Sequence, residues 1–387
     1  MLRSVYLVSK CFRPSWTQLK CVSAQRCFRN YHLTVTRSGA NQVAEKVKTL
    51  NSTNYSATST RSRFISTIKW VIVGTFIGFG SVFLYDIFVP DERELQDGKH
   101  YYSDWMIRTY CSFPLNALSR VFGSLGYLHI PVCMRSVLLG YYVRTFGCRM
   151  DEALVEDLSQ YSTFAEFFNR ELKPVLRPIS DAALVSPADG KVLQFGEVSN
   201  NRVEFVKGCD YEITEFLGPV DPKVDPSRRL YQMVIYLSPG MYHGFHSPAR
   251  FVCENELHVP GLLLSVRPSV LDRLPDLLCR NERVVLSGRW KHGFFSMTAV
   301  AATSVGDISI DADPNLRTNV RNISNKLGEG TCSSRALYHA YKPGEKIGEF
   351  RLGSTIVLIF EAPPTITFAI EAGDDLKYGQ SLIVKGV

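Results

Sequence analysis

Several absences narrow what this 387-residue sequence can be. The first 44 residues contain no aspartate or glutamate. The ten cysteines form no CxxC pair and have no regular spacing, so the sequence indicates neither a zinc site nor a disulfide framework, and we expect free thiols. No internal repeat is present. What is present, 45% hydrophobic and 21% charged residues, is typical of a globular protein with room for two or three average domains.

The acid-free segment 1–44 carries seven lysines and arginines among hydroxyl-bearing and scattered apolar residues. This composition is typical of a mitochondrial transit segment, whereas a secretory signal needs a continuous apolar centre. The alternative is a disordered basic arm. Nucleic-acid binding is disfavoured, because the basic excess lies outside any motif-bearing domain. Residues 45–69, which include a stretch rich in Ser, Thr and Asn, are predicted to be a linker.

Residues 70–85, WVIVGTFIGFGSVFLY, contain no charged residue, and the only charged residue within 70–88 is Asp86. We predict a transmembrane helix over 70–88, with a buried core helix as the alternative. Trp70 and Tyr85 fall at the expected interfaces, and basic residues precede the span while acidic residues follow it. This asymmetry predicts a mitochondrial inner-membrane protein whose chain after Pro90, including the catalytic domain, faces the intermembrane space.

The pattern of the remaining chain predicts an α+β fold. Residues 104–180 have apolar residues at helical spacing and interleaved aromatic and basic residues, typical either of helices on a membrane surface or of helices against a core. Residues 181–387 contain short runs rich in Val, Ile, Phe and Tyr, broken by turn formers, and are predicted to form a mostly antiparallel, β-rich catalytic domain. The clearest predicted strands are residues 230–237, 282–288, 295–310 and 354–362.

Three turn-rich places carry groups that can do chemistry: Asp189 in SPADGKV, His243 and His246 in YHGFHSP, and Ser354 after Gly353 in LGST. An aspartate, a histidine and a serine from different strand ends could form a relay in which the imidazole takes the serine proton. The hydroxyl would then attack a carbonyl.

Other interpretations of these residues stay open. Two histidines three residues apart could hold a metal, but Gly244 and Pro248 favour a loop and no third ligand follows at a suitable spacing. The attacked carbonyl could belong to a substrate, as in a serine hydrolase, although the G-x-S-x-G motif is absent around Ser354. It could instead belong to Gly353, so that the chain cleaves itself. Gly-Ser is also a common turn, and a binding module would use none of these groups.

The motifs together resemble the phosphatidylserine decarboxylase family, in particular its mitochondrial members. The likeness covers residues 103–387. It rests on SPADGKV, YHGFHSP and LGST in this order, with further matches at 161–179 (YSTFAEFFNRELKPVLRPI), 206–218 (VKGCDYEITEFLG) and 346–361 (KIGEFRLGSTIVLIFE).

The resemblance implies an inactive proenzyme that undergoes autocatalytic serinolysis between Gly353 and Ser354, with His246 as the base and Asp189 as its orienting partner. Ser354 would become a pyruvoyl group, the only cofactor implied, without metal or pyridoxal phosphate. This group would form a Schiff base with phosphatidylserine, and loss of CO2 would give phosphatidylethanolamine. His243 is the candidate proton donor by position.

The implied partners are phosphatidylserine in a membrane and the chain's own two fragments, held as a heterodimer, with a homodimer as a further candidate assembly and no nucleic acid. Lys207 is a candidate contact for the substrate phosphate or carboxylate. A solvated lysine at a strand end is the alternative for this residue.

Overall fold

The structure is a computed structural model, and it describes residues 104–198, 202–206, 209–220, 222, 224–274, 276–303, 307–320, 332–351 and 353–384. All of them belong to one compact unit, Asp91–Val387. The predicted transit segment, linker, transmembrane helix and Lys207 lie outside the described residues. Within the described ranges, no helix has both the length and the apolar character needed to cross a membrane.

Helices dominate the first part of the described chain, as predicted. The α-helices and 3-10 helices of this segment are α2 (Asp104–Ser112), α3 (Leu115–Gly126), α4 (Val132–Phe146), η1 (Met150–Glu152), η2 (Leu158–Gln160), α5 (Phe164–Phe168) and η3 (Pro174–Leu176). Helix α4 follows Pro131 and ends at Gly147, whose φ of 64° lies in the left-handed region that glycine adopts readily. We call residues 104–176 the helical segment.

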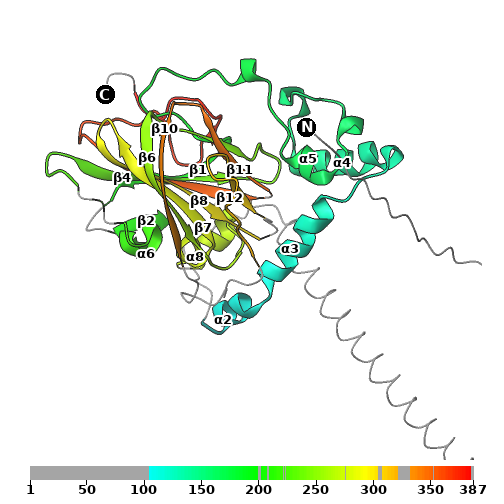
Figure 1. Cartoon of the computed structure of the whole chain (residues 1–387), viewed down its shortest axis with the longest axis horizontal. Coiled ribbons are helices and arrows are strands. Elements are labelled where there is room, and N and C mark those ends of the chain that lie inside the picture. The colour runs from blue at the N-terminus through cyan, green and yellow to red at the C-terminus, as the bar shows by residue number, and fades with distance from the viewer. Residues whose placement is uncertain are drawn as a thin grey trace, which may run out of the picture. The chain divides into compact units, whose positions relative to one another are not determined.

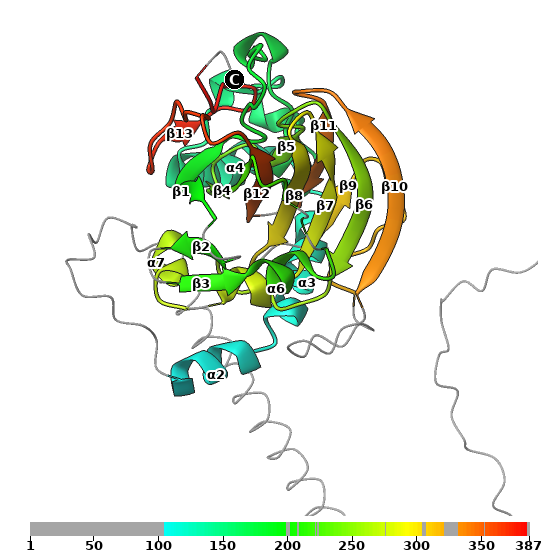
Figure 2. The ribbon, with the colours of Figure 1, turned by 90° about the vertical axis from the view of Figure 1, so that its left-hand side faces the viewer.

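Strands dominate from Gly190 onward, and every pairing between named strands is antiparallel, which confirms the predicted β-rich architecture. The main sheet has the order β10-β6-β7-β8-β12-β4-β1-β13. Its strands are β1 (Gly190–Glu197), β4 (Arg229–Leu237), β6 (Phe251–Val259), β7 (Arg283–Trp290), β8 (Gly293–Ala301), β10 (Ser333–Tyr341), β12 (Ser354–Ala362) and β13 (Asp375–Leu376). Figure 2 shows this sheet as a curved layer, with β10 along one edge.

Smaller elements complete the domain. A three-stranded sheet has the order β5-β11-β9, and β2 pairs with β3. The bounds are β2 (Arg202–Val206), β3 (Cys209–Glu212), β5 (Gly244–His246), β9 (Ile308–Ile310), β11 (Lys346–Phe350), α6 (Ile213–Leu217), α7 (Pro268–Leu271) and α8 (Leu277–Arg280). The predicted strand at 295–310 is therefore two strands, β8 and β9, in different sheets.

Strand β12 lies inside the main sheet, between β8 and β4, and all nine of its residues are buried. Its sequence, STIVLIFEA, is nearly continuous in apolar and β-branched side chains, which suits a strand covered on both faces. Its first residue, Ser354, pairs with Leu237 on one side and Ala301 on the other. The proposed cleavage point thus stands at the entrance to a strand that is buried along its whole length.

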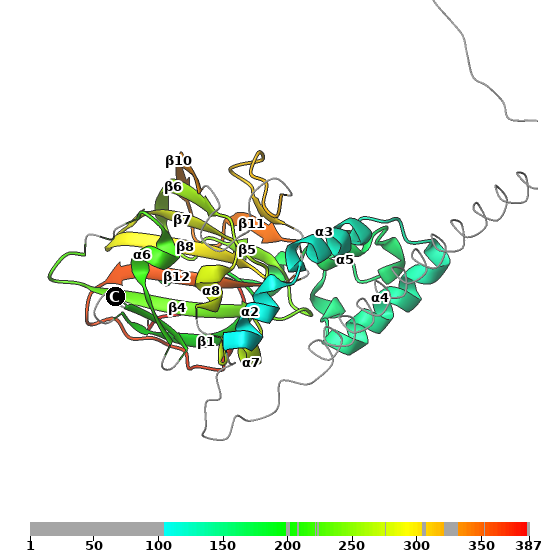
Figure 3. The ribbon, with the colours of Figure 1, turned by 90° about the horizontal axis from the view of Figure 1, so that it is seen from below.

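The helical segment contacts one end of the strands. Helices α4 and α5 lie beyond that end in two perpendicular views (Figures 1 and 3). The Tyr142 hydroxyl on α4 donates a hydrogen bond to the Pro239 carbonyl, 3.0 Å away, just after β4. Asn169 donates to the carbonyl of Phe350, at the end of β11, over 3.2 Å. The helical segment therefore covers the sheet edge where Ser354 begins β12.

Two separate groups of buried apolar residues support these regions. The larger fills the β-rich domain, and a small one holds Leu139, Cys148, Tyr161 and Phe167 of the helical segment.

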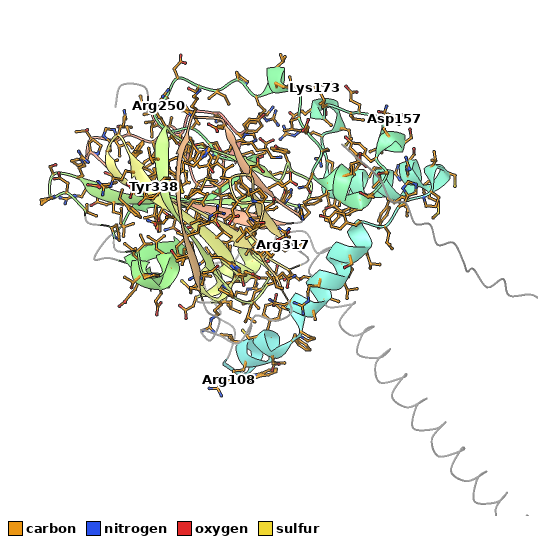
Figure 4. The ribbon with its side chains drawn as sticks, viewed as in Figure 1. Arg108, Asp157, Lys173, Arg250, Arg317 and Tyr338 are labelled. Carbon is orange, nitrogen blue, oxygen red and sulfur yellow. The ribbon has the colours of Figure 1, made fainter. Side chains whose placement is uncertain are left out.

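In Figure 4, the side chains of Arg108 on α2 and Asp157 before η2 point outward from the ribbon. Apolar side chains are also exposed on helices α3 and α4: Val121, Leu125, Val132, Met134, Val137, Leu138 and Tyr141.

Candidate active site

Three strand ends bring the predicted site residues to one edge of the main sheet. Ser354 pairs with Leu237, the last residue of β4. On the other side of β4, Lys191 pairs with Tyr236, so that Asp189, just before β1, lies at the same end. These residues are far apart in sequence, and the antiparallel register alone places them at a common edge.

The Gly353-Ser354 bond enters β12 through an unusual backbone conformation. Gly353 has φ of 32°, in the left-handed region that residues with a Cβ rarely adopt. The Ser354 side chain is fully buried, and its Oγ has no hydrogen-bond partner among the described residues. A buried hydroxyl without a partner is uncommon, because no hydrogen bond compensates for the free energy of removing it from water. This hydroxyl is therefore free of competing contacts that would hold it away from a nearby carbonyl.

Asp189 is held by an arginine rather than by a histidine. Arg177 donates from Nε to Oδ1 over 3.0 Å and from Nη2 to Oδ2 over 2.5 Å, and the backbone N–H of Tyr378 donates to Oδ1 over 2.9 Å. The Arg177 guanidinium is fully buried and also binds Glu152. Charge-assisted, forked contacts of this kind fix a carboxylate strongly in position.

Glu152 extends this ion-pair network. Its carboxylate accepts hydrogen bonds from Arg177 and, over 2.9 Å, from Lys377. Burial favours the neutral acid, but these hydrogen bonds outweigh it and lower the pKa of Glu152 to about 2. Glu152 is therefore an anion throughout the physiological pH range. The network joins the helical segment to a residue near the end of the chain.

His246 sits in a buried aromatic pocket that keeps it neutral. Its Nδ1 lies 2.9 Å from the carbonyl oxygen of Gly344, and its Nε2 lies 3.3 Å from the Tyr242 hydroxyl. A carbonyl can only accept, so Nδ1 carries the proton and Nε2 carries the lone pair. The ring stacks on Tyr378 with centroids 4.0 Å apart. Burial lowers the pKa of His246 to about 4, so Nε2 is available as a base at neutral pH.

The uncut chain does not join Asp189 and His246 by a hydrogen bond, although both residues are described. The Nδ1 proton that Asp189 would accept is directed to Gly344, and both Asp189 oxygens are engaged by Arg177. Their proposed relay therefore stays a prediction. It requires the two side chains to change partners or to act through the Tyr378 segment, which contacts both.

His243 lies beside the segment that leads to the Gly353-Ser354 bond. It is fully buried, and its backbone carbonyl accepts a hydrogen bond from Phe350 N over 2.9 Å, four residues before Ser354. Its Nδ1 lies 2.9 Å from the carbonyl of Met241, which leaves the lone pair on Nε2, an atom without a partner among the described residues. The Phe168 ring contacts the imidazole with centroids 4.2 Å apart. Burial lowers the pKa of His243 to about 3.

Sequence reasoning gave no role to Arg177, Glu152, Tyr242 or Tyr378. Arg177 and Tyr242 stand inside the quoted motifs, but nothing in the spacing shows that Arg177 would bind Asp189 or that Tyr242 would face His246. The only signal in the sequence was that Arg177 directly precedes a proline, Pro178, inside a quoted motif. Among the described residues, no group of three or more His, Cys, Asp or Glu side chains is arranged to hold a metal ion.

Comparison with known proteins identifies the family of this site. A family model described as phosphatidylserine decarboxylase matches residues 164–384, more than half of the chain. The chain belongs to the phosphatidylserine decarboxylase family. It is 55% identical over 322 residues to the mitochondrial phosphatidylserine decarboxylase proenzyme of Caenorhabditis elegans, covering 83% of this chain and 85% of the relative.

Other relatives of the phosphatidylserine decarboxylase family agree. The mitochondrial proenzyme of Cricetulus griseus is 43% identical over 307 residues, covering 72% of this chain and 74% of the relative. The mitochondrial proenzyme 1 of Saccharomyces cerevisiae is 32% identical over 420 aligned positions, covering 82% of this chain and 84% of the relative. The matched residues include Asp189, both histidines and Ser354, so the family assignment covers the whole sheet edge described above.

Proposed function

We propose that this chain is the proenzyme of a mitochondrial phosphatidylserine decarboxylase, which cleaves itself between Gly353 and Ser354. The observation that carries the proposal is the Ser354 hydroxyl, which is buried, has no hydrogen-bond partner among the described residues, and directly follows a left-handed glycine. Family membership and the names of the relatives support the same function. Neither the cleavage nor the roles of individual residues follow from the family name alone.

In the proposed cleavage, His246 Nε2 takes the proton of Ser354 Oγ, and Oγ attacks the carbonyl carbon of Gly353. The C–N bond breaks as a C–O ester bond forms, and the nitrogen receives the proton. A base then removes the α-proton of residue 354 as the bond between its Cβ and Oγ breaks, which forms dehydroalanine and releases Gly353 as a carboxylate. Water finally replaces the nitrogen of the resulting dehydroalanine, so that ammonia leaves and a pyruvoyl group remains. The sequence consists of an acyl shift, an elimination and the hydrolysis of an imine, with the accompanying proton transfers, and no external oxidant or reductant is required.

The two fragments would stay together after cleavage. Residues 354–387 contain β12, which has a long neighbouring strand on each side. They also contain Lys377 and Tyr378, which bind Glu152 and Asp189 of the larger fragment. Extracting β12 would expose a continuous apolar strand to water, at a cost of about 1.5 to 3 kcal/mol for each large side chain. A heterodimer is therefore the expected mature state.

The pyruvoyl group would supply a carbonyl that draws the electron pair left on the α-carbon when CO2 departs. His243 is the proposed proton carrier, acting at Nε2. This atom would take the proton that the substrate ammonium releases before its amine reacts, and would return it to the α-carbon after the carboxylate is lost. The Nε2 lone pair, which has no hydrogen-bond partner among the described residues, supports this role, because a neutral imidazole can first accept a proton and then donate it.

The substrate is a bilayer lipid, and the helical segment offers a surface for it. Apolar side chains on α3 and α4 are exposed, including Val137 at 68% and Tyr141 at 58%. Contiguous exposed apolar side chains mark interaction surfaces, and these helices adjoin the site. The relatives' mitochondrial names support that compartment. The proposed inner-membrane span and the orientation toward the intermembrane space rest on the sequence pattern of residues 70–92.

A denaturing gel of purified full-length protein tests the proposal. We expect two fragments and conversion of phosphatidylserine to phosphatidylethanolamine. The Ser354→Ala protein should remain one uncut, inactive chain, and Thr355→Ala, which changes the neighbouring hydroxyl, should still be cut. A serine hydrolase with the same residues would be active as an intact chain. Decarboxylation by the uncut Ser354→Ala protein would disprove the proposal.

A further inference from the structure

Arg170, which follows α5, is buried with an incompletely used guanidinium. The residue is only 3% exposed. Its Nη2 donates to the Gly240 carbonyl over 2.8 Å, and the guanidinium lies 5.4 Å from the centroid of the Phe167 ring. Its Nε and Nη1 have no hydrogen-bond partner among the described residues. A buried cation with unused donors is costly, so a group that binds it would recover a large interaction.

The other buried arginines of the described chain differ from Arg170. Arg135, Arg177 and Arg283 are each less than 10% exposed. In all three, every guanidinium nitrogen donates to an oxygen or contacts a ring nitrogen. Structural arginines in this fold are thus fully satisfied. Arg170 is the exception, and it lies beside the candidate active site.

Arg170 lines a cavity of about 190 Å³ that also touches Asp189, Ser238 and Tyr242. This is room for several waters at ~30 Å³ each, or for one compact oxyanion. Ser238 directly follows Leu237, the partner of Ser354. The cavity therefore reaches the sheet edge that carries the scissile bond.

The charges around this cavity favour an anion. Its lining includes the carboxylates of Glu152 and Asp189, but both are already bound to Arg177. Lys377 and the half-exposed Arg149 also contact Glu152. Arg149, Arg177 and Lys377 thus neutralise the two carboxylates, and Arg170 adds a further positive charge to the lining of the cavity. Among the buried arginines of the described residues, Arg170 is the one whose guanidinium keeps donors without a partner.

We propose that Arg170 and this cavity bind an oxyanion of the substrate, namely the phosphodiester of the lipid headgroup. This inference rests on the proposed function. A carboxylate of the headgroup has the same chemistry, but an arginine paired with it would stabilise the charge that must be lost and would oppose decarboxylation. The phosphodiester keeps its charge throughout the reaction. Binding it would therefore act equally on bound substrate and transition state, and would lower KM without changing kcat.

The first test needs no catalysis. In the uncut Ser354→Ala protein, glycerophosphoethanolamine, inorganic phosphate and free serine would be titrated by calorimetry at constant ionic strength. The first two probes carry phosphate, and serine carries only a carboxylate. We expect saturable binding of glycerophosphoethanolamine and phosphate. Adding Arg170→Gln should weaken it by about 10- to 100-fold, the value of a hydrogen bond to a charged group, while Arg229→Gln, a half-exposed arginine at the opposite end of β4, should change it less than about threefold.

The outcomes separate the sources of the anion. Binding of serine but not of the phosphate compounds, lost in Arg170→Gln, would assign the site to the carboxylate and overturn the phosphodiester proposal. No binding by the folded Ser354→Ala protein would overturn the anion site itself, whatever the activity of the native enzyme. If the Arg170→Gln protein does not fold, the titration of the Ser354→Ala protein, in which Arg170 is intact, still shows whether the site binds phosphate, a carboxylate or neither.

The second test uses the cleaved, active protein and phosphatidylserine in mixed micelles. For Arg170→Gln we expect normal cleavage, a KM raised by about 10-fold or more, and kcat within about threefold of the parent. The Arg170→Lys variant keeps the charge but loses the guanidinium fork, so its KM should lie between those of the parent and of Arg170→Gln. A reduced kcat with unchanged KM would contradict the proposal, because it would place Arg170 in the chemical step.

Discussion

Apolar side chains are buried in the main sheet, whereas many of those on the helical segment are exposed to solvent. In β12 every residue is buried, between neighbours on both sides and layers on both faces. On α3 and α4 only a few residues are buried, and large apolar side chains such as Val137 and Leu138 remain exposed. The difference indicates that the sheet is built for stability, and in the proposed mature enzyme it would hold the two fragments together. The helical segment is built to cover the site and to offer an apolar surface.

The largest expected effect falls on the sheet edge. His246→Ala removes the proposed base for Ser354, and we expect the uncut precursor to accumulate, with at least about a 100-fold loss of cleavage rate. A time course on denaturing gels after synthesis in vitro measures this rate. His292→Ala, at the turn between β7 and β8, is the matched control and should be cut normally. Cleavage of His246→Ala at the normal rate would exclude the relay.

His243→Ala separates the two reactions at the same edge. We expect normal cleavage, since its proposed role begins only after the fragments form, and a decarboxylation rate lowered by roughly 100-fold. Fragment yield and CO2 release, measured on one preparation, report the two steps. If the cleaved His243→Ala protein decarboxylated its substrate at the parent's rate, His243 would not be the proton carrier.

Arg177 joins the two regions, and its replacement should destabilise the fold. Arg177→Gln leaves the buried carboxylates of Asp189 and Glu152 without their shared cation, and breaking a buried pair in this way costs about 3 to 5 kcal/mol. Chemical denaturation of the uncut Ser354→Ala protein measures the loss. Arg229→Gln, which breaks a half-exposed pair with Glu197, should cost less than about 1 kcal/mol. Equal losses in the two variants would show that the network contributes little.

Paired truncations measure the contrast between β12 and α4 directly. Leu358→Ala leaves a cavity in the central strand and should cost about 2 to 5 kcal/mol. Leu138→Ala, on the exposed face of α4, should cost less than about 0.5 kcal/mol but weaken binding to phosphatidylserine-containing vesicles. Denaturation and vesicle sedimentation separate the two effects. A large stability loss in Leu138→Ala would mean that α4 belongs to the core rather than to a membrane surface.

The last expected effect is a pH dependence of stability. The pKa of His246 is about 4 in the fold, below the ordinary histidine value of 6.5, so between these values the unfolded chain binds more protons. Its contribution is complete above pH 6.5 and is lost as pH falls through 4. A difference of this size corresponds to about 3 kcal/mol. Denaturation of the Ser354→Ala protein at pH 7 and pH 4.5 should show the loss, and His246→Gln should reduce it.

The sequence predicted the secondary-structure elements of the fold better than the side-chain contacts of the candidate site. Strands such as β4 and β12 were recognisable because buried strands need continuous β-branched and apolar residues. Strand β10 was missed because most of its residues are exposed, so no apolar run marks it. For the site, the motifs predicted Asp189, His243, His246 and Ser354, and the structure places Asp189 and Ser354 at one end of the main sheet, while the catalytic roles of all four stay predictions. The binding of Asp189 by Arg177 could not be predicted, because that contact depends on how the helical segment meets the sheet edge.

The mass of the small fragment tests the central claim most directly. Intact mass spectrometry of the purified protein should show a fragment covering residues 354–387 that begins with a pyruvoyl group, and it should resist Edman degradation. The mass would then report the cleavage position and the fate of Ser354 together. A fragment beginning with an unmodified serine, or an active chain of uncut mass, would contradict the account.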